Sequence, residues 1–113
     1  MPFLKVSITR FVDSHFPGFV ECQFLDVHGV TKKFEEKIPV VTTEDLWIDS
    51  EYPRPGVVEC AVVRRRLDES RRMRVTIDLN EPLWLEPLDR ENIVEVFAAQ
   101  LDDQEEGSRV EKV

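Results

Sequence analysis

The sequence predicts a mainly all-β domain: a small barrel or sandwich of about six strands, built from two repeated hairpins, with at most one short helix. The first observation behind this prediction is that the chain nearly repeats itself about 38 residues apart. One copy reads Val12-Asp13-Ser14-His15-Phe16-Pro17-Gly18-Phe19-Val20-Glu21-Cys22. The other reads Ile48-Asp49-Ser50-Glu51-Tyr52-Pro53, then two additional residues, Arg54-Pro55, then Gly56-Val57-Val58-Glu59-Cys60. Such internal similarity indicates that one supersecondary unit is used twice.

The second observation is alternation of apolar and polar residues, which is typical of half-buried strands. In the first stretch Leu4, Val6 and Ile8 share one face, and lysine, serine and threonine occupy the other. Five strands are predicted in this way: Phe3 to Val12, Gly18 to Val27, Val30 to Ile38, Val57 to Arg65 and Met73 to Leu79. A turn at His28-Gly29 joins the first hairpin, and Leu67-Asp68-Glu69-Ser70 joins the second.

The third observation is that a proline, Pro39 or Pro82, follows the last strand of each predicted hairpin. Proline cannot donate a ladder hydrogen bond and so ends a central strand. Thr42 to Leu46 can form a single helical turn capped by a threonine. Asn92 to Gln100 fits both a helical face and a β-branched strand, and we favour a final strand.

Length and composition predict one domain over residues 1–101, because 113 residues are too few for two independent cores. Residues 102–113 are mostly charged and predict a flexible acidic tail. The opening residues carry no long apolar run, and no stretch approaches the roughly 20 apolar residues of a membrane-spanning helix. We therefore expect a cytoplasmic protein without a membrane segment.

The two cysteines, Cys22 and Cys60, occupy the same position in the two copies. Free cysteine in a strand behaves as a small hydrophobic residue, so two core thiols are the favoured interpretation. If the copies pair about a pseudo-twofold axis the two thiols can meet, and a disulfide is the less favoured alternative in a reducing cytoplasm.

Six arginines gather in the second predicted hairpin: Arg64, Arg65, Arg66, Arg71, Arg72 and Arg74. Only Asp68 and Glu69 oppose them, so this hairpin carries +4 of a chain whose net charge is −8, which leaves −12 for the rest. A ribbon rich in guanidinium groups can follow a phosphate backbone. The acidic body repels nucleic acid, however, and the hairpin lacks aromatic residues for base stacking. We therefore favour an edge hairpin whose arginines blunt edge pairing or pair with the protein's own acids.

Four aromatic residues outside the alternating strands are candidates for a partner surface: Trp47, Tyr52, Trp84 and Phe97. Tryptophan and tyrosine concentrate binding energy when a partner desolvates them, but they also plug the ends of small β domains. Trp47 and Tyr52 lie in the long connector between the hairpins, which makes them the favoured surface pair.

Catalytic chemistry finds little support in the chain. Glu21 and Glu59 recur in equivalent strands and can meet only across a pseudo-axis, so solvated glutamates are the favoured interpretation. His15 and His28 lie in turns, away from the strands that carry the cysteines, which disfavours a nucleophilic triad. The spacing lacks the close ligand pairs of zinc sites, and a glycine-rich phosphate loop is also missing. We expect neither an enzyme nor a bound cofactor.

Several runs carry a resemblance: Pro17-Gly18-Phe19-Val20-Glu21-Cys22, Asp26-Val27-His28-Gly29, Phe34-Glu35-Glu36-Lys37-Ile38-Pro39-Val40-Val41 and Tyr52-Pro53-Arg54-Pro55-Gly56. With these runs, residues 3–100 resemble a group of small bacterial proteins of about this length to which no activity is assigned. The resemblance implies a stand-alone bacterial cytoplasmic domain and supplies no site residues.

These observations favour a non-enzymatic protein-binding module with an acidic surface and a basic partner, for example an inhibitor of a basic toxin. The alternative is binding of nucleic acid or a phosphate ligand by the arginine hairpin, and a thiol-dependent enzyme is the least favoured hypothesis. A homodimer formed by strand-edge pairing is a further expectation that the sequence leaves open. The candidate partner-binding residues are Trp47, Tyr52, Arg64, Arg66, Arg72 and Arg74.

Overall fold

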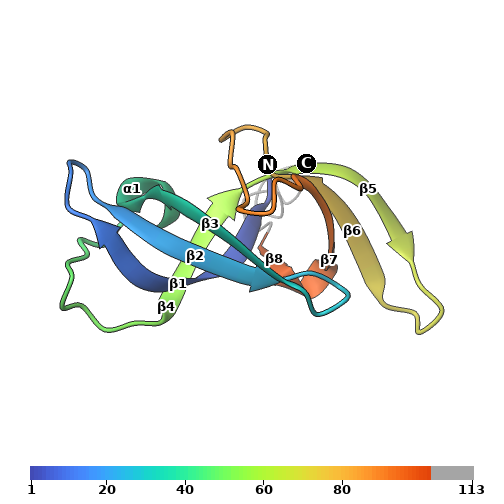
Figure 1. The fold of residues 1–113 in the computed structure, drawn as a ribbon. Helices are drawn as coiled ribbons and strands as arrows, with labels where there is room; N and C mark the ends of the chain where they lie inside the picture. The colour runs from blue at the N-terminus through green and yellow to red at the C-terminus, as the bar shows by residue number, and fades with distance from the viewer. Residues whose placement is uncertain (103–113) are drawn as a thin grey trace, which may run out of the picture.

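The computed structural model describes residues 1–102, and the predicted acidic tail lies, apart from Asp102, outside the described residues. The described chain folds into two antiparallel sheets that share one core (Figure 1). The first sheet has the order β3-β2-β1-β4 and also includes β8; its strands are β1 (Phe3–Asp13), β2 (Phe19–Leu25), β3 (Thr31–Lys37), β4 (Arg54–Glu59) and β8 (Leu101–Asp102). The second sheet has the order β5-β6-β7, with β5 (Ala61–Leu67), β6 (Met73–Asp78) and β7 (Ile93–Phe97). The prediction of a mainly β protein is confirmed, with more strands than expected.

Strand β1 organises the first sheet because it pairs with β2 along one edge and with β4 along the other. Ile8 lies opposite Cys22 of β2 and opposite Arg54 of β4. The short β8 adds to β1 beside Phe3 and Leu4, where β2 no longer reaches. Strands β2 and β4, which carry the two similar cysteine-containing sequences, therefore flank one central strand.

The predicted strand from Val57 to Arg65 is wrong in extent, because the chain bends at Cys60 and changes sheets. Its first half, β4, pairs with β1, and its second half, β5, pairs with β6. Cys22 therefore lies within β2, whereas Cys60 lies at the corner between the sheets, so the two cysteines are not in equivalent settings. Both thiols are free and buried, as expected of core cysteines.

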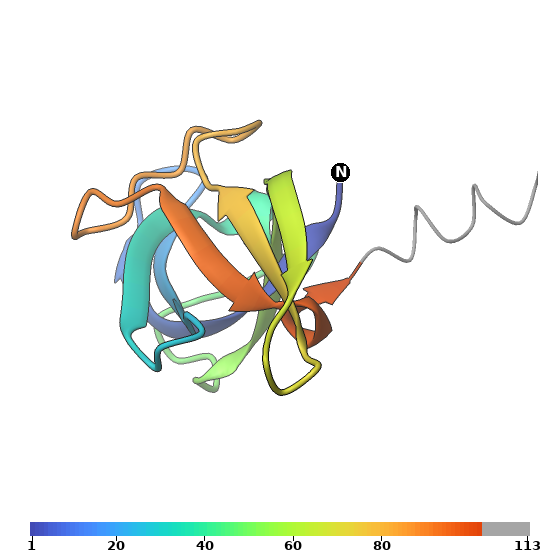
Figure 2. The same ribbon diagram turned by 90° about the vertical axis from the view of Figure 1, so that its right-hand side faces the viewer.

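The sheets do not close into a barrel within residues 1–102, which corrects the barrel alternative. On the side away from β4 and β5, no strand pairing joins the sheets. Two backbone hydrogen bonds cross there: the Val27 amide donates to the Glu95 carbonyl at 2.9 Å, and the Leu88 amide donates to the Lys33 carbonyl at 2.9 Å. Figure 2, which views the molecule from the side of the second sheet, shows the resulting open roll.

The core lies between the inner faces of the two sheets. Its fully buried members include Leu4, Ile8, Val20, Phe34, Val58, Val75, Ile77 and Val96. These residues alternate with exposed or half-buried ones along their strands, as period-two patterning requires. The buried apolar residues of the described chain form a single cluster.

The helical turn forms earlier than predicted, at α1 (Ile38–Val41) instead of Thr42 to Leu46. Proline fits the first turn of a helix because its missing amide would have no helical acceptor there, and Pro39 occupies this place. Thr42 has an extended backbone and ends the turn, with its amide bonded to the Ile38 carbonyl at 3.1 Å. The favoured strand near the C-terminal end is confirmed as β7, followed by a 3-10 turn, η1 (Ala98–Gln100). No helix in residues 1–102 is both long and apolar enough to cross a membrane.

Candidate functional site

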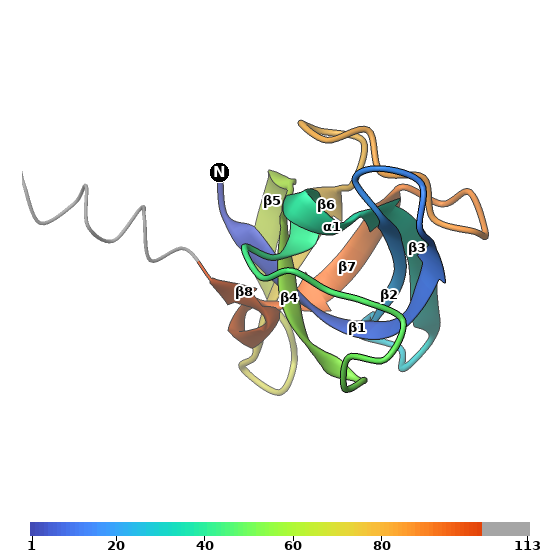
Figure 3. The same cartoon turned by 90° about the vertical axis from the view of Figure 1, so that its left-hand side faces the viewer.

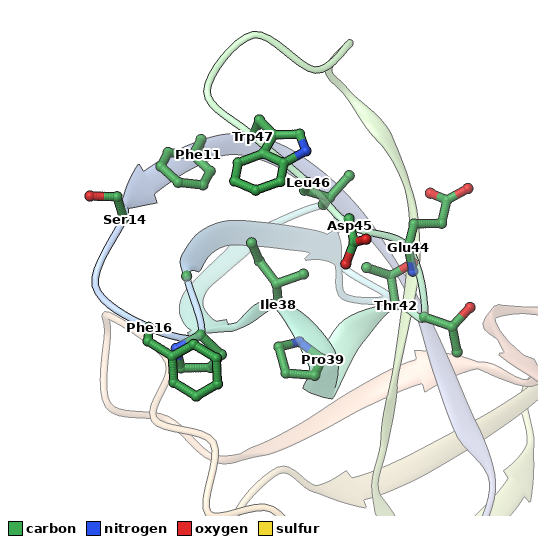
Figure 4. A pocket seen from close by; sticks show the side chains of 13 residues that line it. Phe11, Ser14, Phe16, Ile38, Pro39, Thr42, Glu44, Asp45, Leu46 and Trp47 are labelled. Carbon is green, nitrogen blue, oxygen red and sulfur yellow. The ribbon is translucent and has the colours of Figure 1, made fainter.

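A cavity lies at one end of the molecule, beside the turn between β1 and β2 (Figure 4). It has a volume of about 610 Å³, within the range of small-ligand and peptide pockets. Three pieces of chain line it: the end of β1 with the turn 14–18, the start of α1, and the connector 42–47. Phe11, Ile38 and Leu46 supply apolar surface, and Phe16 and Trp47 lie on either side of Ile38. We call this cavity the aromatic pocket.

Local hydrogen bonds fix the β1–β2 turn. The Asp13 carboxylate accepts the His15 amide at 2.9 Å and contacts the His15 ring nitrogen Nδ1 at 2.7 Å. The Gly18 amide donates to the His15 carbonyl at 2.6 Å, and Gly18 has φ +94°, a conformation that favours glycine. The Ile38 amide then donates to the Gly18 carbonyl at 2.9 Å, which ties the turn to α1. The turn therefore holds Phe16 at the rim, with 96% of its surface exposed.

The connector between α1 and β4 is ordered by a second set of bonds (Figure 3). The Trp47 amide donates to Ser50 Oγ at 2.9 Å, and the Trp47 carbonyl accepts the Ser50 amide at 3.1 Å. The Tyr52 hydroxyl donates to the same Trp47 carbonyl at 2.6 Å. Tyr52 is half-buried against the core, whereas the Trp47 side chain is 65% exposed. Of the predicted surface pair, Trp47 is exposed. Tyr52 is half-buried, and its hydroxyl holds the Trp47 backbone through this hydrogen bond.

The segments around the aromatic pocket are acidic, and two of their carboxylates, Glu44 and Asp45, line the pocket itself. Residues 13–18 and 42–51 contain no lysine or arginine and five carboxylates: Asp13, Glu44, Asp45, Asp49 and Glu51. Arg54 approaches from β4 and pairs with Glu44 at 2.6 Å. Hydrogen bonding from the His15 backbone and ring lowers the pKa of Asp13, and the bond to Asp13 raises the pKa of His15. The end of the molecule therefore combines exposed apolar surface with negative charge.

Phe16 is the residue of this site that the sequence analysis did not single out. A signal was present, since Phe16-Pro17 in the first copy corresponds to Tyr52-Pro53 in the second. The peptide bond before proline is cis in both copies. The two aromatic side chains nevertheless differ, because Tyr52 packs on the core and Phe16 extends into solvent.

The predicted arginine cluster lies at the opposite end, in the β5–β6 hairpin, and two of its six arginines form ion pairs. Arg66 donates to both carboxylate oxygens of Glu95, at 2.9 and 3.3 Å. Arg74 donates to Asp68 at 2.9 Å and lies 3.6 Å from Glu95. The bond from Arg66 lowers the pKa of Glu95, and bonds from the Arg72 backbone and the Arg74 side chain lower that of Asp68.

The remaining hairpin arginines differ in their surroundings. The Arg72 guanidinium lies 3.6 Å from the centre of the Phe97 ring, so β7 supplies an aromatic partner that the hairpin itself lacks. Arg64, Arg65 and Arg71 are exposed and form no ion pair with any residue from 1 to 102. For the possible strand-edge homodimer, the outer strand β5 is one candidate edge. A register irregularity between Val62 and Arg64 and the arginine side chains disfavour pairing through this strand.

The groups considered for catalysis do not assemble into a site. Burial raises the pKa of the Cys22 thiol to about 12 and that of Cys60 to about 11, which disfavours the reactive thiolate form of both. Glu21 and Glu59 lie opposite Arg10 and Phe3 of β1, and these positions are roughly 23 Å apart along a strand at about 3.3 Å per residue. Within the described part of the chain, no group of three or more histidine, cysteine or acidic residues could hold a metal ion.

A buried lysine lies on the inner face of the first sheet, beside Phe34, and the sequence analysis did not single it out. The Lys32 side chain is 2% exposed, and its ammonium group donates to the Asp89 and Glu91 carboxylates. Burial opposes the charged form, but these hydrogen bonds outweigh it and raise the pKa of Lys32, while the same bond lowers that of Asp89. Because Leu88 also bonds to the neighbouring Lys33 carbonyl, the cluster fastens the loop before β7 to β3. We assign it a structural role.

Comparisons with protein families, with curated proteins and with solved structures find no match to this chain.

Proposed function

We propose that the chain is a non-enzymatic protein-binding module whose aromatic pocket accepts an apolar side chain of a basic partner. The observation that carries the proposal is the exposure of Phe16 and Trp47 on either side of a preformed cavity. Exposed aromatic rings gain about 25 cal/mol for each Å² that a partner removes from water. Trp and Phe are also among the residues enriched at protein interfaces.

The charge around the pocket supports a basic partner. Asp45, Asp49 and Glu51 are exposed, and none of them forms an ion pair within residues 1–102. Opposite charge on a partner would speed encounter and fix its orientation, while the buried apolar contact would supply most of the affinity.

Selection of random twelve-residue peptides displayed on phage, with the full chain as bait, tests this proposal. We expect the recovered peptides to be enriched in arginine and lysine and to carry an apolar residue. They should lose binding to the Phe16→Ala/Trp47→Ala double variant. The matched control is Trp84→Ala, because Trp84 is also exposed, at 76%, but lies outside the pocket. Absence of enrichment, or equal binding to the double variant, would remove the proposal.

Nucleic-acid or phosphate binding by the arginine hairpin is the second candidate. The stacking of Arg72 on Phe97 favours it, because this contact holds one guanidinium group in a fixed orientation. A salt titration of binding to short DNA and RNA tests it, with Arg64, Arg66, Arg72 and Arg74 changed together to glutamine. A salt-independent signal, or equal binding by the variant, excludes this candidate.

A further inference from the structure

We infer that the aromatic pocket recognises an extended, proline-containing segment flanked by arginine or lysine, bound in the polyproline II conformation. This inference rests on the proposed function and names the class of segment that the pocket takes. Three modes of peptide recognition are available to a small β domain: strand addition, a helix in a groove, and polyproline II docking. The backbone and side-chain groups around the pocket distinguish them.

Strand addition needs free backbone donors and acceptors along the docking site. Six backbone amides around the pocket already donate within the chain: those of His15, Gly18, Ile38, Thr42, Glu44 and Trp47. The lining segments 14–18 and 42–47 are also turns and irregular chain with no strand edge. A partner strand would find only the short unpaired edge of β1 beyond Ile8, where Phe11 alone lines the pocket.

A docked helix needs a long apolar groove that receives side chains from successive turns. A helix with its side chains is about 10–12 Å wide, and two of its turns extend about 11 Å. The aromatic pocket has a volume of about 610 Å³ and is bounded by turns that carry carboxylates at its rim. It can receive one or two side chains, which matches short extended segments better than a helix.

A polyproline II segment needs apolar and aromatic walls for its rings and side-chain donors for its carbonyls, because it forms no internal hydrogen bonds. The pocket supplies the walls through Phe11, Phe16 and Trp47, together with two prolines, Pro17 and Pro39. Three donor groups belong to its lining residues, the Ser14 and Thr43 hydroxyls and the Trp47 indole N–H, of which the Ser14 hydroxyl points away from the cavity in Figure 4. None of these three groups donates a hydrogen bond within residues 1–102.

The acidic rim sets the flanking residues of the segment. The carboxylates of Asp45 and Glu44 line the pocket itself, and Glu44 already pairs with Arg54. Asp45 and the nearby Asp49 therefore remain to pair with a cation on the bound segment. Arginine fits best because its guanidinium group binds a carboxylate through two parallel hydrogen bonds.

Titration of the full chain with three blocked synthetic peptides tests the inference. The first has four consecutive prolines with two arginines at each end; the second replaces the prolines with alanine; the third replaces the arginines with glutamate. Trp47 fluorescence is followed in a Trp84→Phe background, and amide shifts in a ¹⁵N spectrum locate the contact. We expect the first peptide to bind about tenfold or more tightly than the other two. Its binding should be lost in Trp47→Ala and kept in Trp84→Ala.

The outcomes separate this inference from the proposed function. If the alanine peptide binds as tightly as the proline peptide, and both depend on Trp47, the pocket takes cationic segments without selecting proline; the inference then fails and the proposed function stands. If the proline peptide does not bind, while phage selection returns Trp47-dependent peptides without proline, the inference fails in the same way. If neither experiment gives Trp47-dependent binding, both fail. Asp45→Asn/Asp49→Asn should weaken binding of the first peptide severalfold at low salt, and Glu69→Gln, at the other end, should leave it unchanged.

Discussion

The two ends of the molecule in Figure 1 both carry concentrated charge, but their charged groups have different partners. At the end with the aromatic pocket, Asp45 and Asp49 face solvent beside exposed rings. At the hairpin end, Arg66 and Arg74 pair with Glu95 and Asp68 and Arg72 stacks on an aromatic ring, whereas the other three hairpin arginines are exposed and form no ion pair among residues 1–102. Charge that is already paired within the chain has less to gain from a partner than charge and apolar surface that are not. Because exposed aromatic rings and a cavity lie beside the carboxylates left unpaired among residues 1–102, we propose the binding surface at the acidic end, although the arginine cluster is the more conspicuous pattern in the sequence.

The largest expected effect comes from Gly18→Ala at the pocket end. A Cβ atom at this position would lie 2.8 Å from Ile38 Cδ1, and φ is +94°. We expect a loss of about 2–4 kcal/mol in the free energy of unfolding, from backbone strain and overpacking together. Urea denaturation measures it.

Gly29→Ala is the matched control. Gly29 also has positive φ, +79°, but an added Cβ there meets nothing within 4 Å. It should lose only the backbone contribution, about 1–2 kcal/mol. Equal losses in the two variants would mean that Gly18 does not pack against α1 as described, and the rigidity of the pocket would be in doubt.

A smaller effect is expected from Glu95→Gln at the hairpin end. This change removes the shared partner of Arg66 and Arg74, whose side chains are 45% and 23% exposed, so screening limits the loss to about 0.5–1 kcal/mol. It also leaves the arginines less compensated, so the variant should elute from a heparin column at higher salt than wild type. Glu69→Gln makes the same change in net charge at an exposed residue without an ion pair among residues 1–102, and should change stability less. If the two variants have equal stability, Glu95 does not organise the hairpin.

The sequence was sufficient to predict the hairpin of β2 and β3, because alternation and a glycine turn are both local signals. It could not predict the change of sheet at Cys60. Val58, Cys60 and Val62 continue one apolar face through the bend, and this pattern does not specify which strand each half will pair with. The first half pairs with β1, which is about 50 residues earlier in the chain, and only the folded register reveals this.

The candidate site was also predictable only in part, because local signals identify single residues and not the contacts between distant segments. Trp47 was found because it is an aromatic residue in a long connector. Phe16 and Ile38 were not, because the pocket forms only where the β1–β2 turn meets α1. Lys32 had a usable signal, since it shares the inner face of β3 with Phe34, but its partners Asp89 and Glu91 are more than 50 residues away. Long-range pairings of this kind leave no local pattern in a single sequence.

Thiol labelling tests whether the two cysteines in the core between the ends are unreactive in the native protein. With pKa values of about 12 and about 11, Cys22 and Cys60 have little thiolate at pH 8. We expect both to react at least about 100-fold more slowly than a free thiol in the native protein, and rapidly after unfolding in urea. A thiol that reacts at the free rate in the native protein would revive the hypothesis of a thiol-dependent enzyme.

The smallest effect expected is a pH dependence confined to the pocket end. Hydrogen bonding to Asp13 raises the pKa of His15 above its ordinary value of 6.5. A group whose pKa is raised by folding contributes stability below its unfolded pKa and loses it as pH rises through the folded pKa. Asp13→Asn should therefore lower the pKa of His15 in an NMR titration, and the stability difference between wild type and variant should be larger at pH 5.5 than at pH 8.5. The backbone bond from the His15 amide does not titrate with the ring, so part of the difference should persist at pH 8.5. A His15 pKa that is the same in both proteins would show that the turn next to Phe16 is not held by this ion pair, and that its order comes from Gly18 and α1 alone.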